Sequence, residues 1–154
     1  MPATKSKILG AYRHRGLECI CGNLRMASRA LTSLYDAHLK PAGLTANQMA
    51  VLWCVLAREP TAMSEVAHTV VMDKTTVSRN MASLAAMGLV RMQVGGDARQ
   101  RLVSSTARGR EAFAAAIPVW RAAQAQVART TGAALFASLV KQTRAIAAAI
   151  GRGR

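Results

Sequence analysis

The feature that most constrains this chain is a pair of short helical segments joined by only two residues. Ser64 is a suitable N-cap for a helix over residues 65–70, and Asp73 is a suitable N-cap for a helix over residues 74–86. Only residues 71–72 separate the two segments. Two short helices at this spacing predict a helix-turn-helix.

A β-hairpin is predicted directly after this pair. Gly88 suits the left-handed position that ends a helix, and residues 89–94 then alternate as in a strand. Gly95 and Gly96 permit a turn, and a second strand follows the basic tip at residues 102–103. The chain therefore combines a helix-turn-helix with a glycine-bounded hairpin.

The second short helix has two chemically different faces, since a helix advances about 100° per residue. Val77, Met81 and Leu84 fall on one face, while Thr75 and Arg79 lie nearly opposite. Thr76 and Ser78 flank the apolar stripe, and Asn80 lies only about 60° from it and ranks below the others as a base reader. The polar side suits base edges and phosphates in a major groove, although many solvated helix faces have the same pattern.

Four more helices are predicted around this motif. Two precede it, over residues 18–38 and, after Thr45 as N-cap, over residues 46–58, where Pro60 ends the helix. Two alanine-rich helices follow it, over residues 107–127 and 131–150, and Pro118 predicts a kink or an earlier boundary in the first. The predicted fold class is mainly α with a small β-hairpin wing.

Charge indicates the class of partner. The chain has 154 residues, with 21 lysines and arginines against 7 acidic residues, a formal charge of +14. Such an excess favours a polyanion, although a merely basic surface is the alternative. The longest purely apolar run, residues 49–57, is too short to span a membrane, and residues 1–16, a basic N-terminal arm, have no signal-peptide core. We expect one cytoplasmic domain over residues 17–154, with no membrane partner.

The sequence has few features that would indicate an enzyme. It has no phosphate-binding glycine loop, GxSxG or HExxH, and its carboxylates are scattered singly. We therefore expect no catalysis. A non-specific architectural DNA-binding protein is the alternative that the charge permits, but the ordered polar face of residues 74–86 argues for sequence-specific contacts.

The cysteines leave two interpretations open. Cys19 and Cys21 form a CxC at the start of the first predicted helix, where two buried thiols are the simpler interpretation. The other is a thiol or soft-metal sensor, completed by Cys54, by His14 or by a second subunit. Because residues two apart point about 200° away from each other in a helix, a joint site needs an extended or frayed start.

Residues 24–113 resemble the MarR family of winged-helix regulators. SEVAHTVVMDKTTVSRNMASLAAMGLV is similar to the family's helix-turn-helix, followed by the strand LVRMQV, and GDARQRLVSSTARGREAF is similar to its wing. The resemblance implies that Thr75, Thr76, Ser78 and Arg79 lie in the major groove, that Arg99 probes the minor groove and that Asp97 braces it. One departure is Ser105, where the family usually has an apolar residue. The full set of expected DNA-binding residues is Ser64, Lys74, Thr75, Thr76, Ser78, Arg79, Asp97, Arg99 and Arg101.

The resemblance also implies an assembly and an effector. Residues 45–106 would form the DNA-binding lobe, and residues 17–40 and 107–150 the dimerisation helices, so that a homodimer binds a pseudo-palindromic double-stranded operator. Apolar residues in these helices need more neighbours than one small domain supplies: Phe113, Ile117, Trp120, Leu135, Phe136, Leu139 and Ile146. The family's default is repression, relieved by a small ligand bound between the dimer helices and the lobes. Trp53, Met49 and Arg25 are candidates for lining that pocket, and the alternative is that they are ordinary core and surface residues; no cofactor is certain.

Overall fold

The computed structural model describes residues 18–96 and 100–151. Its helices and strands confirm a winged helix, which long helices precede and follow along the chain. In chain order the elements are α2 (Ile20–Leu39), η1 (Lys40–Ala42), α3 (Ala46–Arg58), β1 (Thr61–Ala62), α4 (Met63–Thr69), α5 (Lys74–Ala86), β2 (Val90–Val94), β3 (Arg101–Ser105), α6 (Ala107–Thr131) and α7 (Ala133–Gly151).

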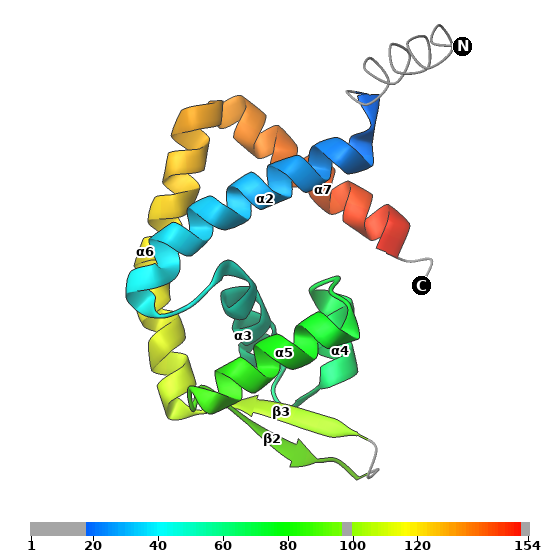
Figure 1. Ribbon diagram of the computed structural model, residues 1–154, viewed down its shortest axis with the longest axis vertical. Helices are drawn as coiled ribbons and strands as arrows, with labels where there is room; N and C mark the ends of the chain where they lie inside the picture. Colours follow the sequence, from blue (N-terminus) through cyan, green and yellow to red (C-terminus); the bar gives the residue numbers. More distant parts are fainter. Residues whose placement is uncertain (1–17, 97–99, 152–154) are drawn as a thin grey trace, which may run out of the picture.

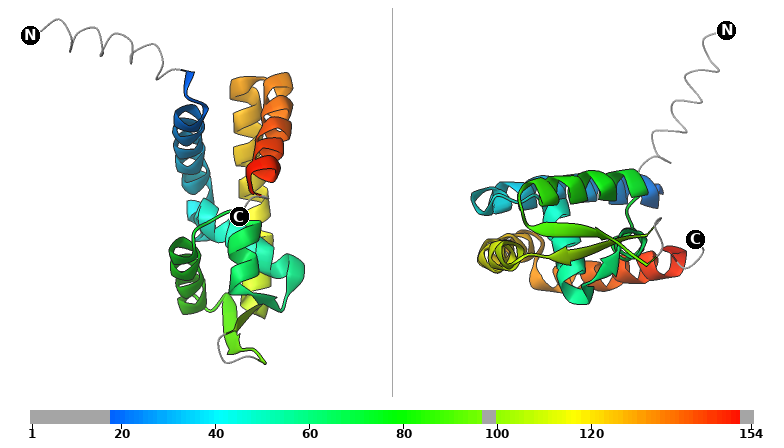
Figure 2. Two further views of the ribbon diagram at one scale, coloured as in Figure 1. Left: turned by 90° about the vertical axis from the view of Figure 1, so that its right-hand side faces the viewer. Right: turned by 90° about the horizontal axis from the view of Figure 1, so that it is seen from below.

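The elements divide the molecule along its long axis. The hairpin β2–β3 lies at one end, α3, α4 and α5 lie above it, and α2 and α7 lie at the other end (Figure 1). The long helix α6 runs beside the lobe from the hairpin to α7, and the left-hand view of Figure 2 shows the same order. One continuous helix thus connects the hairpin with the opposite end.

The hairpin belongs to a three-stranded antiparallel sheet with the order β1-β3-β2. Met92 of β2 and Thr61 of β1 both pair with Val103 of β3. The sequence predicted the hairpin but not β1, because a strand of two residues is too short to show alternation. The third strand ties the hairpin to the start of the helix-turn-helix.

The hydrophobic core lies inside the lobe, where α3, α4, α5 and the sheet meet. Buried side chains from these elements form one cluster, and α6 packs against it through Ala116. Its fully buried members include Leu39, Leu52, Val55, Val66, Val77, Met81, Leu84 and Val103. The predicted apolar stripe of residues 74–86 is therefore part of the core, as expected.

The start of α4 differs from the prediction. Ser64 is not the N-cap but the second residue of the helix, which spans Met63–Thr69 instead of residues 65–70, and it is exposed. The carboxylate of Glu65 takes over the capping, since Oε2 accepts hydrogen bonds from Ala62 N–H at 3.3 Å and from the Thr61 hydroxyl at 3.0 Å. The Glu65 carboxylate thereby satisfies the N–H of Ala62, the residue that precedes the helix, and its charge suits the first turn.

Most other helix boundaries agree with the prediction to within a few residues. Thr45 caps α3 reciprocally with Gln48: Thr45 Oγ1 accepts from Gln48 N–H at 3.2 Å, and Gln48 Oε1 accepts from Thr45 N–H at 2.9 Å. Helix α6 continues through Pro118 to Thr131, so no early boundary occurs there. The break falls at Gly132, where φ is +83°.

The start of α6 is held tightly against the end of the helix-turn-helix. Thr106 caps the helix, and its hydroxyl also donates to the carbonyl of Gly88 at 2.7 Å, while its N–H donates to the carbonyl of Leu89 at 3.1 Å. Gly109 lies so close that an added Cβ would be 2.0 Å from the Leu89 carbonyl oxygen. Only glycine fits this approach.

Candidate nucleic-acid interface

The first turn of α5 is fixed by Asp73. Its carboxylate accepts hydrogen bonds from Thr76 N–H at 2.8 Å and from the Thr76 hydroxyl at 2.6 Å. These bonds to Thr76, side chain first, lower the pKa of the Asp73 carboxyl below its usual value. The acidic cap therefore stays ionised and orients the start of the helix that carries the predicted base readers.

The outer face of α5 is polar and accessible. Lys74, Thr75, Ser78 and Arg79 are exposed, opposite the buried stripe of Val77, Met81 and Leu84. A helix with one face in the core presents the other to a groove of DNA without further rearrangement.

Two polar residues of α5 are less available. Thr76 is half-buried, and its hydroxyl proton is donated to Asp73. Asn80 is also half-buried, and its Nδ2 donates to the Thr76 carbonyl at 2.8 Å. Thr76 thus serves the cap of the helix and retains only acceptor capacity for a base. Helical phase ranked Asn80 below the other polar residues as a base reader, and its hydrogen bond within the helix agrees with that ranking.

A cleft of about 260 Å³ separates the helix-turn-helix from the hairpin. Ser64, Lys74, Ser78 and Arg101 all line it, so the structure brings together four of the predicted site residues from three elements. Gln100 lines it as well and was not singled out from the sequence. Its place in the basic tip, next to Arg101, was the available signal. Asp97 and Arg99 lie outside the described residues.

Ser105, the departure from the family pattern, has a polar role at the base of the hairpin. It is buried, its N–H donates to Glu59 Oε2 at 2.5 Å, and its hydroxyl accepts from Arg110 Nη1 at 2.9 Å. Glu59 also lies 3.8 Å from Arg110. The hydrogen bonds from the side chain and backbone of Ser105, and then the charges of Arg110 and Arg91, lower the pKa of Glu59. This network joins the end of α3, the sheet and α6.

A second, larger pocket lies between α2, α3 and α6. Its volume is about 480 Å³, and its lining includes Tyr35, Met49, Trp53, Trp120 and Arg121. Met49 and Trp53 are placed as predicted, whereas Arg25 is not among the lining residues. The sequence analysis did not identify Tyr35 and Arg121. The feature that could have indicated them is a polar group at the edge of the apolar face of each helix.

Tyr35 links the two helices that form the wall of this pocket. Its hydroxyl donates a hydrogen bond to Gln124 Oε1 of α6. Burial raises the pKa of the Tyr35 phenol. The pocket therefore has an apolar wall with a neutral hydroxyl and one guanidinium, that of Arg121, at its border.

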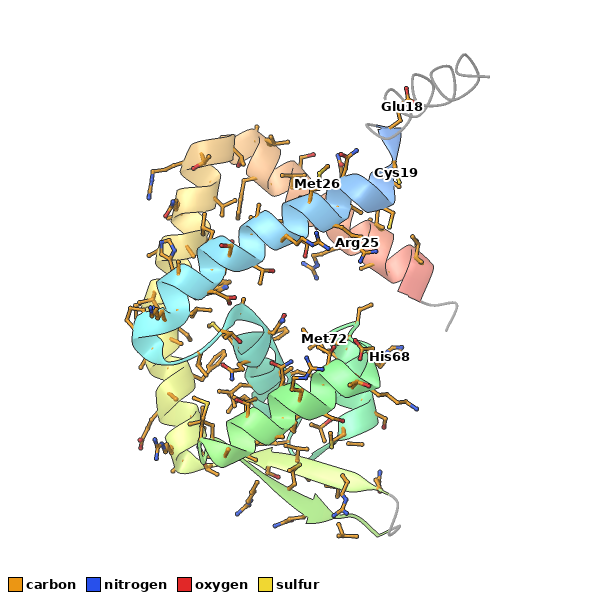
Figure 3. All side chains as sticks on the ribbon, viewed as in Figure 1. Glu18, Cys19, Arg25, Met26, His68 and Met72 are labelled. Atoms are coloured by element: carbon orange, nitrogen blue, oxygen red, sulfur yellow. The ribbon has the colours of Figure 1, made fainter. Side chains whose placement is uncertain are left out.

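Cys54 does not lie with the other two cysteines. Cys54 is buried in the core of the lobe, whereas Cys19 and Cys21 are exposed at the start of α2. Figure 3 shows Cys19 there, apart from His68 at the end of α4. Cys19 is the extended N-cap, with Sγ accepting from Gly22 N–H at 3.4 Å. No group of three or more His, Cys, Asp or Glu suited to a metal occurs among residues 18–96 and 100–151, and His14 lies outside them.

Helices α2 and α7 leave large apolar side chains uncovered. Ile20 and Met26 of α2, and Leu135, Val140 and Ile150 of α7, are between 44% and 70% exposed. Ala133–Ile150 is long and apolar enough to cross a membrane and has no buried residue within this chain. Uninterrupted apolar runs do not reveal this helix, because Lys141 and Arg144 divide it. Exposed apolar side chains gathered on two helices are typical of an interaction surface.

Comparisons with known proteins agree with this geometry. Residues 44–109 match the model of a winged helix DNA-binding domain. The M. tuberculosis transcriptional regulator MosR, solved in complex with DNA, is 34% identical, with 85% of this chain and 98% of that chain covered and a TM-score of 0.70.

More distant structures share the fold. The transcriptional repressor CouR, bound to a 23-mer DNA duplex, is 20% identical over 84% of this chain and 93% of its own, with a TM-score of 0.75. A MarR-family regulator from Rhodococcus sp. RHA1 is 21% identical over 88% of this chain and 94% of its own, with a TM-score of 0.71. Comparison with curated proteins gives no match.

Proposed function

Because the chain belongs to the MarR family of winged helix-turn-helix transcriptional regulators, we propose that it is a sequence-specific, DNA-binding repressor. The observation that carries this proposal is α5: its apolar stripe is buried and its polar side chains are exposed beside a basic hairpin. The similar structures are those of regulators, and MosR and CouR are both solved with DNA; we propose no catalytic activity for this chain. Binding to DNA implies a cytoplasmic location.

The base readers are Thr75, Ser78 and Arg79, which enter the major groove. Arg79 is the strongest candidate for a bidentate contact with guanine, because its guanidinium has parallel donors. Following the family resemblance, Arg99 at the hairpin tip probes the adjacent minor groove and Asp97 braces it.

The test compares an operator, selected from genomic fragments by the parent protein, with a scrambled duplex of equal length. Arg79→Ala should weaken operator binding by about 1–3 kcal/mol, roughly 5- to 150-fold, and change binding to the scrambled duplex much less. Arg129→Ala, an exposed arginine near the end of α6, is the matched control. Equal affinity of the parent for every duplex would instead favour non-specific DNA coating.

The functional unit is a homodimer. The uncovered apolar side chains of α2 and α7 form its interface, and the two lobes then read the halves of a pseudo-palindromic site. Sedimentation of the parent at micromolar concentration should show a dimer without DNA. A folded monomer under those conditions contradicts this interface.

Release from DNA is the second part of the proposal. The pocket lined by Tyr35, Met49, Trp53 and Trp120 suits a small apolar or aromatic effector. Of the neighbouring structures, CouR from Rhodococcus jostii RHA1 is solved with p-coumaroyl-CoA bound. A library of aromatic acids, scored by release of the operator, tests this route, and Trp53→Ala should lower the response to any hit.

Thiol or soft-metal chemistry at Cys19 and Cys21 is the alternative trigger. Both thiols are exposed, and α2, which they begin, belongs to the proposed interface. Replacing both with serine keeps an N-cap, because serine is among the best capping residues. If peroxide, arsenite or copper releases the parent from the operator but not the double variant, the thiols are the trigger. An equal response, or none from the parent, excludes them.

A further inference from the structure

The cleft between the helix-turn-helix and the hairpin has the chemistry of an anion site. Lys74 of α5 and Arg101 of β3 supply positive charge from its two sides. Ser64, Ser78 and Gln100 add hydroxyl and amide donors, and none of the described residues that line the cleft is acidic. Every polar side chain on its surface can therefore donate a hydrogen bond to an oxyanion.

Both cationic positions are held by rigid elements. Lys74 is the first residue of α5, directly after the Asp73 cap, and Arg101 pairs with Val94 in the sheet. The hairpin is closed just above by the Gly95 N–H, which donates to the Gln100 carbonyl at 2.8 Å. Among the described residues, neither cation has an ion pair with a carboxylate. The charges stay available for a partner.

The location of the cleft indicates which anion it holds. If α5 lies in a major groove and the hairpin tip in the neighbouring minor groove, as proposed above, one sugar–phosphate strand must pass between them. The cleft lies between these two elements. We propose that Lys74 and Arg101 hold one backbone phosphodiester of the DNA between the helix-turn-helix and the hairpin, with Ser64 as a further hydrogen-bond donor.

This proposal rests on the proposed function and assigns Arg101 a different role from Arg99. A phosphate contact carries no sequence information; it sets the register of the helix on the duplex. The phosphate held in the cleft also fixes the spacing between base reader and hairpin, because its two cations come from separate elements. Loss of either cation should weaken all DNA equally.

The experiment measures Kd of Lys74→Gln and Arg101→Gln for the selected operator and the scrambled duplex over a range of KCl concentrations. Each variant should lose affinity for both duplexes by a similar factor, several-fold. The slope of log K against the logarithm of the salt concentration should become shallower by about one unit. Lys40→Gln and Arg129→Gln remove the same charges at exposed positions outside the cleft and should change neither quantity comparably.

A methylphosphonate scan of the operator identifies the phosphate itself. Neutralising that single phosphate should weaken the parent most, weaken Lys74→Gln and Arg101→Gln less, and cause no further loss in the variant that carries both substitutions. Sensitivity of the two variants to different phosphates, or behaviour like the controls, overturns the proposal. The proposal is also overturned if inorganic phosphate raises the melting temperature of the parent but not that of Lys74→Gln or Arg101→Gln, while these variants bind DNA as tightly as the parent. That result would indicate a site for free anions. A parent that binds neither duplex refutes the proposed function instead.

Discussion

Gly109→Ala tests the junction between α6 and the helix-turn-helix. The new Cβ would lie 2.0 Å from the Leu89 carbonyl oxygen and 2.9 Å from its carbon, whereas real Cβ contacts essentially never fall below 3.0 Å. The two backbone segments must separate by at least about 1 Å, because neither atom is at the end of a flexible side chain. That shift also strains the bond from Thr106 N–H to the Leu89 carbonyl, now 3.1 Å.

The magnitude follows from three contributions. Overpacking costs about 1–3 kcal/mol, and a lost backbone hydrogen bond about 1 kcal/mol. The better helix propensity of alanine returns up to about 1 kcal/mol. We expect Gly109→Ala to lower the free energy of unfolding by about 1–4 kcal/mol and to weaken DNA binding, because the hairpin starts at this junction.

Gly22→Ala is the matched control. Gly22 occupies the same third helical position in α2 as Gly109 does in α6, and its N–H is likewise bonded to the N-cap side chain. A Cβ there would meet nothing closer than 3.7 Å, so the substitution should be neutral or stabilising by up to about 1 kcal/mol. The measurement is urea unfolding at one fixed protein concentration, since a dimer's stability depends on concentration. Equal stability of the two variants would refute the close-contact argument.

Three further predictions concern strain, pH and the pocket wall. Val71, a β-branched residue with φ of +52°, is exposed; Val71→Gly should raise stability by about 1 kcal/mol in urea unfolding, and a loss would contradict the strain. Because the pKa of Glu59 is lowered in the folded protein, the stability that its carboxylate contributes is present above the unfolded pKa and is lost as pH falls through the folded pKa. Glu59→Gln should therefore lose less stability than the parent between neutral and acidic pH. Parallel losses of the two proteins would exclude a role for the bond between Glu59 and Ser105. Tyr35→Phe should cost about 0.5–1.5 kcal/mol, and a double-mutant cycle with Gln124→Ala should show that the two losses are not additive.

The sequence predicted the local features of the site because each depends on neighbours in the chain. Asp73 and Thr45 cap the helices that follow them, and the buried face of α5 follows from helical phase alone. Ser64 was misplaced because the helix begins one residue before it, at Met63, with Glu65 bonded back to the N–H of Ala62, and residue type alone does not show which of two neighbouring polar residues fixes a helix start.

The remaining features depend on contacts between distant residues. β1 exists because Thr61 and Ala62 meet β3 some forty residues later. The cleft depends on the pairing of Arg101 with Val94 in the sheet, because this pairing holds Arg101 on a cleft that Lys74, more than twenty residues earlier, also lines. Likewise, the sequence shows Ser105 only as a polar residue in an apolar position. The structure explains the polar residue by its hydrogen bonds to Glu59, at the end of α3, and to Arg110 of α6.

The unbroken helix α6 also has a mechanical meaning. Its 25 residues form a rod about 37 Å long, which joins the apolar end of the molecule to the base of the hairpin. A tilt of about 5° at one end of such a rod moves the other end by roughly 3 Å, close to one base-pair step along DNA. Pro118, which cannot donate the hydrogen bond expected of its position, makes the middle of the rod its most compliant point. The pocket wall on α6, from Phe113 to Arg121, lies about 9–21 Å from the start of the helix, so an effector that tilts this wall by about 10° moves the base of the hairpin by roughly 2–4 Å.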